Sequence, residues 1–322
     1  MSTRTPHLPF PLYRRPARDA GRKMPWSCLL LAPAASAHVL DPSTPAPSWV
    51  SWSFDPLVLA ALGASLVLYV LGYRQLRQRS RAGARPLRAR QAAAFLGGWL
   101  SLGVALVSPL DGLGAALFSA HMVQHELLMI VAAPLLVLGR PLGVWVWALP
   151  ARWRKRVGTA LRWRPFKVAW DGITTPVGAW LMHAAALWLW HMPALFQSAL
   201  LHPWIHTLQH TSFLASALVF WWTIFRHPGG AALLSLFTTM VHTGALGALL
   251  TLAPDLWYPL YVEPSAALGI DALQDQQMGG LVMWVPGGLA YFASALVMVA
   301  RWLDERHAST PSRSPSPAPE VP

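Results

Sequence analysis

The sequence predicts an all-α fold, a polytopic membrane helix bundle with about seven transmembrane helices after a signal peptide. Hydrophobic residues make up 54% of the 322 residues and charged residues only 12%. Several apolar runs reach about 20 residues, the length that crosses the hydrocarbon core of a bilayer. All 25 lysines and arginines lie in the leader, in the tail and in alternate connections between these runs, a bias typical of membrane proteins with cytoplasmic basic loops.

The basic residues set the predicted orientation. They are confined to residues 1–23, 74–90, 140–167, Arg226 and the segment from Arg301 onward, and are absent from connections 38–55, 111–114, 192–203 and 254–277. We therefore expect a multi-pass protein of the bacterial inner (plasma) membrane, with the N-terminus outside after cleavage and the C-terminus cytoplasmic. Because short loops between spans account for the net charge of +12, we expect the bilayer, and no nucleic acid, as the partner of these residues.

Residues 1–37 have the pattern of a signal peptide. A basic segment ending at Lys23 precedes an apolar core over residues 26–35 and the small residues Ala35-Ser36-Ala37. Cleavage after Ala37 would remove Cys28, the single cysteine, and so exclude thiolate metal sites; an uncleaved anchor is the alternative. We expect a seven-span domain over residues 38–306 and a disordered cytoplasmic tail, rich in Ser and Pro, over residues 307–322.

Each apolar run is predicted to be one span, with successive spans crossing in opposite directions. The predicted spans are residues 56–73, 92–110, 115–138, 172–191, 204–225, 231–253 and 278–300. The second and third are expected to be joined by a turn at Asp111–Gly114, and the sixth and seventh by a long outer loop.

Histidines concentrate on the predicted outer side. Eight lie in spans or outer connections: His121, His125, His183, His191, His202, His206, His210 and His242. Ionisable groups are costly in a bilayer and normally face the bundle interior with a partner. His121 and His125, like His206 and His210, are four residues apart and share one helical face.

Imidazole is a ligand for copper, zinc, iron and nickel. We predict six metal ligands from spacing and depth: His121, His125, His183, His206, His210 and His242. His191 and His202 are less favoured because they lie at span ends, and hydrogen-bonded packing or proton handling is the alternative for all. Thioethers also bind Cu(I), so nearby methionines such as Met122 and Met192 are further candidates.

Three other polar residues are predicted to support the site or to act as a relay. Glu126 is the carboxylate deepest in a span; it is either a neutral acid hydrogen-bonded to a neighbouring helix or a relay beside His125. Asp275 and Gln276, at the outer edge, are expected to close the pocket, orient imidazoles or dock a partner, unless Asp275 caps its own helix. No catalytic residue is predicted. Gln124 replaces the glutamate that a zinc-peptidase pattern would need.

Several motifs, in order along the chain, resemble the CtaG family of integral-membrane cytochrome c oxidase assembly factors. They are residues 121–125 (HMVQH), 132–141 (AAPLLVLGRP), 190–196 (WHMPALF), the series His202, His206 and His210, and residues 275–280 (DQQMGG) and 283–287 (MWVPG). The resemblance covers roughly residues 50–303. It implies a non-enzymatic role in forming a haem-copper oxidase, with copper as the cargo, oxidase subunits as partners and a periplasmic copper donor.

Two other functions remain open from the sequence. Paired histidines could hold haem between helices in a membrane redox enzyme. Alternatively, Glu126 and the histidines could act as a relay in a proton or metal transporter, although no inverted repeat is visible.

Overall fold

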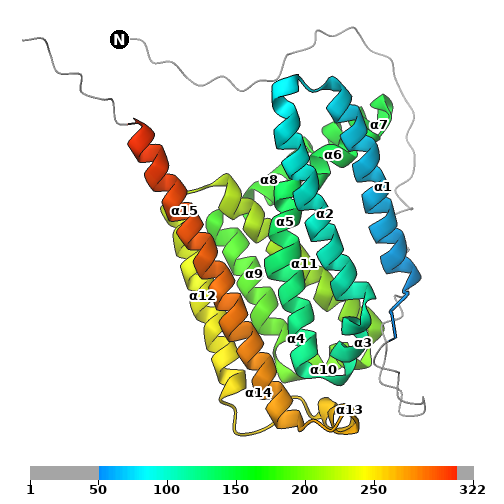
Figure 1. Cartoon of the computed structure of the whole chain (residues 1–322), viewed down its shortest axis with the longest axis vertical. Coiled ribbons are helices and arrows are strands. Elements are labelled where there is room, and N and C mark those ends of the chain that lie inside the picture. The colour runs from blue at the N-terminus through cyan, green and yellow to red at the C-terminus, as the bar shows by residue number, and fades with distance from the viewer. Residues whose placement is uncertain (1–50, 310–322) are drawn as a thin grey trace, which may run out of the picture. The chain divides into compact units, whose positions relative to one another are not determined.

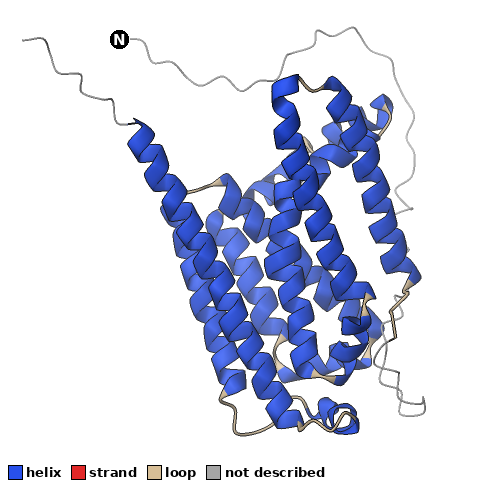
Figure 2. Ribbon diagram, in the orientation of Figure 1, coloured by secondary structure: helices blue, strands red, loops and turns tan. Residues whose placement is uncertain are grey.

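The computed structural model describes residues 51–309, which form helices and connecting turns with no strand (Figures 1 and 2). Each predicted span is helical over most of its length, so the fold class is confirmed. Five continuous helical segments are long and apolar enough to cross a membrane: α1 (Pro56–Arg79), α2 (Arg85–Val107), Phe118–Gly139, α12 (Gly230–Thr251) and Ala272–Leu303. The chain is therefore a helical membrane protein.

The remaining two predicted spans are less regular. α9 (Pro176–Trp190) has 15 residues and is followed, after a bend of 74°, by α10 (Pro193–Leu201); the pair together is long and apolar enough to cross. α11 (Pro203–Arg226) has 24 residues, but it does not join the apolar set because histidine and glutamine side chains interrupt its sequence.

Proline and polar caps start many of these helices. Pro56 begins α1 directly after Asp55, whose carboxylate accepts a hydrogen bond of 2.7 Å from the Leu57 amide. Proline suits the first turn of a helix because it lacks an amide hydrogen that would be unpaired there. Thr175 caps α9 in the same way, accepting from the Gly178 amide at 3.0 Å.

Short helices fill the connections. On the basic side lie η1 (Ala82–Ala84), α6 (Pro141–Ala148), α7 (Ala151–Ala160) and α8 (Arg164–Ile173). On the other side lie α3 (Pro109–Ala116), η3 (Pro259–Tyr261) and α13 (Val262–Ala267). The expected turn at Asp111–Gly114 is thus part of helix α3. We call the two sides of the bundle the basic end and the histidine end; α6 and α7 mark the first in Figure 1, and α3, α10 and α13 the second.

Two long helices contain a π-helical turn. α4 (Phe118–Glu126) continues through η2 (Leu127–Ala132) into α5 (Ala133–Gly139), and α14 (Ala272–Val282) continues through η4 (Met283–Gly287) into α15 (Gly288–Ser309). Pro286 lies inside η4, as expected for a residue that cannot donate to the regular helical ladder. The predicted signal peptide and residues 310–322 of the predicted tail lie outside the described residues, whereas residues 307–309 continue α15.

The interior toward the basic end is apolar. Phe220, Trp221 and Ile224 of α11 pack with Leu236 of α12, and each of the four side chains is at most 2% exposed. The Trp221 indole donates a hydrogen bond of 2.9 Å to the Met129 carbonyl in η2, so its polar atom is satisfied. We call these four residues the apolar layer; they lie farther along α11 and α12 toward the basic end than the histidines of these helices do.

Candidate metal centre

Five imidazoles from three helices converge near the histidine end. α4 contributes His121 and His125, α11 contributes His206 and His210, and His191 caps the C-terminus of α9. Their ring centroids are 4.1 Å (His206–His210), 4.3 Å (His121–His125), 5.1 Å (His125–His210), 5.5 Å (His121–His206), 5.7 Å (His121–His210) and 6.3 Å (His125–His191) apart. We call these five residues the histidine cluster.

Three rings of the cluster have the spacing of a metal site. One nitrogen from each of His121, His206 and His210 lies within 4.8 Å of the other two. The four-residue spacing on α11 puts His206 and His210 on one face, and His121 meets them from α4. Three imidazoles with one nitrogen each at this mutual distance are a possible ligand set for copper or zinc.

The cluster is buried, and its nitrogens are poorly satisfied. His121, His125 and His191 are at most 2% exposed and His210 is 8% exposed, whereas His206 is half-buried. Both ring nitrogens of His125 and the Nε2 atoms of the other four rings have no hydrogen-bond partner among the described residues. Buried polar atoms are normally paired, so six bare nitrogens in one place fit a bound cation better than ordinary packing.

Backbone carbonyls orient two of the rings. The Nδ1 atom of His121 donates to the Gly114 carbonyl at 3.2 Å, and that of His191 donates to the Leu187 carbonyl at 2.6 Å. In both rings the donated hydrogen leaves Nε2 as the unprotonated nitrogen, which is the atom that can bind a metal. When a histidine binds a metal through one ring nitrogen, the other ring nitrogen commonly donates a hydrogen bond of this kind.

Two tyrosines from the segment after α12 bond to backbone carbonyls next to the cluster. Tyr261 donates to the Gly114 carbonyl at 3.1 Å, and Tyr258 donates to the His191 carbonyl at 2.8 Å. Both tyrosines are at most 1% exposed. Tyr258 and η3 together therefore tie the end of α9 to α3 and fix the backbone near two of the rings.

Asp275 reaches the cluster through helix α4 and does not cap its own helix. Its carboxylate accepts hydrogen bonds from the amides of Phe118 at 2.5 Å and Ser119 at 3.2 Å, and also from the Ser119 hydroxyl. The predicted capping of α14 by Asp275 is wrong, because Asp271 does this by accepting from the Gln274 amide. Asp275 thus satisfies the free amides at the start of α4, three residues before His121.

Gln276 is hydrogen-bonded to the segment that follows α12. Its side-chain oxygen accepts a hydrogen bond of 2.6 Å from the Trp257 amide, and its nitrogen donates to the Asp255 carbonyl at 3.3 Å. The residue is fully buried. Gln276 therefore fixes the segment that leads to Tyr258 and Tyr261 and contacts no imidazole in these hydrogen bonds.

Two predicted ligands lie outside the cluster. His183 is hydrogen-bonded to the Ser216 hydroxyl at 3.1 Å and the Tyr291 hydroxyl at 3.4 Å, and it stacks on Phe220 of the apolar layer. His242 of α12 accepts a hydrogen bond of 3.4 Å from the Trp188 indole. Neither residue contributes a nitrogen to the group formed by His121, His206 and His210.

Glu126 follows the cluster on α4 but faces another helix. The space beside Gly287 of η4 is occupied by its carboxylate, since a Cβ added at Gly287 would lie 3.0 Å from Oε2. Oε2 has no hydrogen-bond partner among the described residues. Glu126, the last residue of α4 before η2, thus packs against the π-helical turn η4, and π-helical turns often occur at functional sites.

His191 belongs to the cluster although it was not among the six predicted ligands. It follows the last residue of α9 and precedes Met192-Pro193. At a helix end, periodicity does not tell which way a side chain points. The signal was the motif Trp190–Phe196 itself, in which a histidine stands at the bend between two apolar helices.

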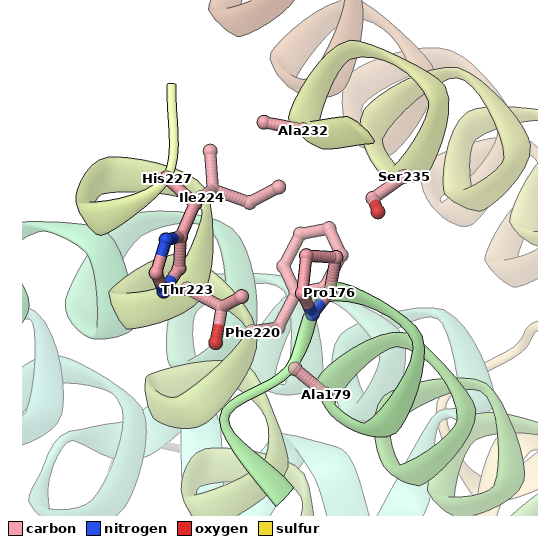
Figure 3. Close-up of a pocket in the computed structure, with 8 residues that line it drawn as sticks. All are labelled: Pro176, Ala179, Phe220, Thr223, Ile224, His227, Ala232 and Ser235. Carbon is pink, nitrogen blue, oxygen red and sulfur yellow. The ribbon is translucent and has the colours of Figure 1, made fainter. Parts of the chain in front are cut away.

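A shallow hollow at the basic end has a different character (Figure 3). It lies between α9, α11 and α12 and is lined by Pro176, Ala179, Phe220, Thr223, Ile224, His227, Ala232 and Ser235. The hydroxyls of Thr223 and Ser235 are already bonded to carbonyls of their own helices. The hollow therefore offers little chemistry, and two residues of the apolar layer, Phe220 and Ile224, form part of its wall.

The fold and the cluster define a helical membrane protein with a buried imidazole site. Residues 67–305 match the family model described as cytochrome c oxidase caa3 assembly factor (Caa3_CtaG). Since the match covers most of the chain, the protein belongs to this family, as the motifs predicted.

Similar proteins add little about function. An uncharacterized protein of Mycobacterium bovis and another of Mycobacterium tuberculosis are each 26% identical over 289 residues, covering 85% of this chain and 43% of the relative. An uncharacterized protein of Mycobacterium leprae is 25% identical over 276 residues, covering 80% and 40%. The chain thus spans less than half the length of these relatives. No solved structure matches.

Proposed function

We propose that this protein is an assembly factor for a haem-copper cytochrome c oxidase and that it holds copper in the histidine cluster before passing it on. The main support is the convergence of His121, His206 and His210, whose nitrogens lie within 4.8 Å of one another. Family membership supplies the link to the oxidase. The copper is cargo in this proposal, and the protein performs no catalysis.

The chemistry of the cluster suits a metal that must be released. Neutral imidazoles bind copper without adding charge, and exchange of one imidazole for a ligand of the partner would loosen the ion stepwise. His206 is the partly exposed ring, and it lies one helical turn from His202 at the start of α11. We propose that copper enters and leaves past His206.

Basic loops support an orientation in the membrane. Arg and Lys residues gather at the end opposite the cluster, and such residues favour the cytoplasmic side. The cluster would then open toward the outside of a bacterial plasma membrane, where oxidase subunits and a periplasmic copper donor would meet it.

The alternative functions have less support in the packing. A haem between His125 and His191 would need space for a broad macrocycle, but His121, His210 and Phe213 already pack against His125 at centroid distances of 4.3, 5.1 and 4.6 Å. Transport would need a polar route to the basic end, where the apolar layer lies.

The test compares two quadruple variants with equal numbers of His-to-Ala changes. The first changes His121, His125, His206 and His210; the second changes His183, His202, His227 and His242. Copper in the purified full-length protein is measured by mass spectrometry of the metal after anaerobic loading. We expect the wild type and the second variant to retain copper and the first variant to lose it.

A cellular measurement completes this test. Cells carrying the first variant should make the oxidase polypeptides but lack oxidase activity, and added copper should restore part of it. Equal copper in both variants, or zinc in place of copper under competition, would contradict the proposal. A folded, monodisperse first variant by gel filtration is the control for misfolding.

A further inference from the structure

The histidine cluster has more bare nitrogens than one copper ion can use. The three converging rings supply three, and His125 and His191 supply three more. Cu(I) in a soft or imidazole site accepts a small number of ligands. His125 and His191 are therefore left with unpaired, buried nitrogens after the first ion is bound.

The separation of these two rings matches a linear arrangement around one ion. Metal–nitrogen distances of about 2 Å on opposite sides of an ion place imidazole centroids about 6 Å apart. The His125 and His191 centroids are 6.3 Å apart, with ring planes at 79°. The three rings of the other position lie closer together, with centroids 5.5 Å (His121–His206), 5.7 Å (His121–His210) and 4.1 Å (His206–His210) apart, so none of these pairs has the spacing of a linear site.

The surroundings of the pair suit a low coordination number. Phe213 lies against both rings, at centroid distances of 4.6 Å from His125 and 6.0 Å from His191. Phe196 covers His191 at 6.3 Å. Both phenylalanines are at most 1% exposed. Phenylalanine rings on two sides place apolar surface next to both imidazoles, a setting that suits a low coordination number and so Cu(I) rather than tetrahedral zinc.

We propose that His125 and His191 form a second, two-coordinate Cu(I) position beside the three-coordinate position of His121, His206 and His210. The inference rests on the proposed function, because it assigns a second ion of the same cargo. His191 Nε2 is the ligand atom at one side, since its Nδ1 hydrogen is held by the Leu187 carbonyl at 2.6 Å. Either nitrogen of His125 is free for the other side.

The two positions are close enough to exchange an ion. His125 lies 4.3 Å from His121 and 5.1 Å from His210, measured between ring centroids. An ion could therefore move from the three-coordinate to the two-coordinate position by replacing one imidazole at a time, without a free intermediate. His206, the partly exposed ring, would load the three-coordinate position first.

The experiment counts ions. The purified full-length protein is titrated anaerobically with Cu(I) in competition with the chelator bicinchoninate, and bound copper per chain is measured. We expect two ions for the wild type, one for His191→Ala, one for His206→Gln/His210→Gln, and two for the matched control His202→Gln/His227→Gln, whose changes flank the same helix.

X-ray absorption identifies which position is lost. The fraction of two-coordinate copper should disappear in His191→Ala and should become the whole signal in His206→Gln/His210→Gln. One ion in the wild type, or unchanged stoichiometry in His191→Ala, would overturn the second position and leave the proposed function intact. No copper in any protein, or equal copper in all variants, would overturn the proposed function as well.

Discussion

At the scale of single residues, the cluster depends on atoms that hold rings in place as much as on the rings. Gly114 provides one carbonyl that accepts from both His121 and Tyr261. Asp275 provides a carboxylate that accepts from two amides at the start of α4. The Asp275 carboxylate can be tested by substitution with asparagine, because an amide side chain has the same shape as a carboxylate but no charge.

Asp275→Asn should reduce the free energy of unfolding by about 1–3 kcal/mol, since hydrogen bonds to a charged group are the stronger ones and this one is buried. It should also weaken copper binding by about 10-fold or more, as changes behind metal ligands commonly do. Thermal unfolding in detergent and Cu(I) competition measure the two effects.

Asp271→Asn is the matched control for this change. Asp271 caps α14 at an exposed position, 2.9 Å from the Gln274 amide, so its loss should cost about 1 kcal/mol or less and leave copper affinity unchanged. Equal copper affinity in Asp275→Asn and the wild type would show that the start of α4 does not position the rings.

Residue spacing predicted part of the cluster and missed the rest for a geometric reason. Four-residue spacing fixes which side chains share a face of one helix, so it paired His121 with His125 and His206 with His210 correctly. It does not fix which neighbour that face meets. His183 therefore contacts Tyr291 and Ser216, and His242 contacts Trp188.

At the scale of elements, close helix packing depends on glycines at one crossing. Gly247 of α12 and Gly280 of α14 face each other, so that a Cβ on Gly280 would lie 2.6 Å from the Thr251 amide nitrogen and one on Gly247 would lie 2.8 Å from the Gly280 carbonyl. Small residues let membrane helices approach closely in this way. Gly279 packs equally tightly against Phe118, which begins the helix of His121.

Gly280→Ala should destabilise the protein by about 1–3 kcal/mol, because backbone atoms cannot move aside as a flexible side chain could. The measurement is the midpoint of thermal unfolding in detergent. Gly63→Ala on α1 is the control, since nothing lies within 4 Å of the added Cβ and alanine favours a helix over glycine. A Gly280→Ala protein as stable as Gly63→Ala would contradict this packing.

The helices themselves were largely predictable, and their irregularities were not. Apolar length and flanking basic residues predicted the spans. The shift of Asp111–Gly114 from turn to helix, and the π-helical turn after Glu126, depend on contacts between elements. Pro286 was the visible sign of the second π-helical turn, whereas residues 127–132 contain no proline or glycine to signal the first.

At the scale of the whole molecule, the cluster and the basic loops occupy opposite ends of the bundle. α11 connects the two, with His202 at its N-cap and His227 at its C-cap. These residues are therefore suitable markers for the proposed orientation, because each is exposed and lies outside the cluster.

His202→Cys and His227→Cys, each in a Cys28→Ser background, should react from opposite sides of the membrane. A thiol reagent that cannot cross the membrane should label His202→Cys in intact spheroplasts and label His227→Cys after the membrane is opened. The reverse pattern would contradict the proposed orientation, and labelling of both from outside would contradict a crossing by α11.

The apolar layer has a consequence for the order of events during copper transfer. Trp221, Phe220, Ile224 and Leu236 are buried between the cluster and the basic end, so, in the proposed function, donor and recipient would both reach the copper past His206. The two partners would then exclude each other and visit in turn, and transfer kinetics would follow a ping-pong scheme in which excess donor inhibits delivery.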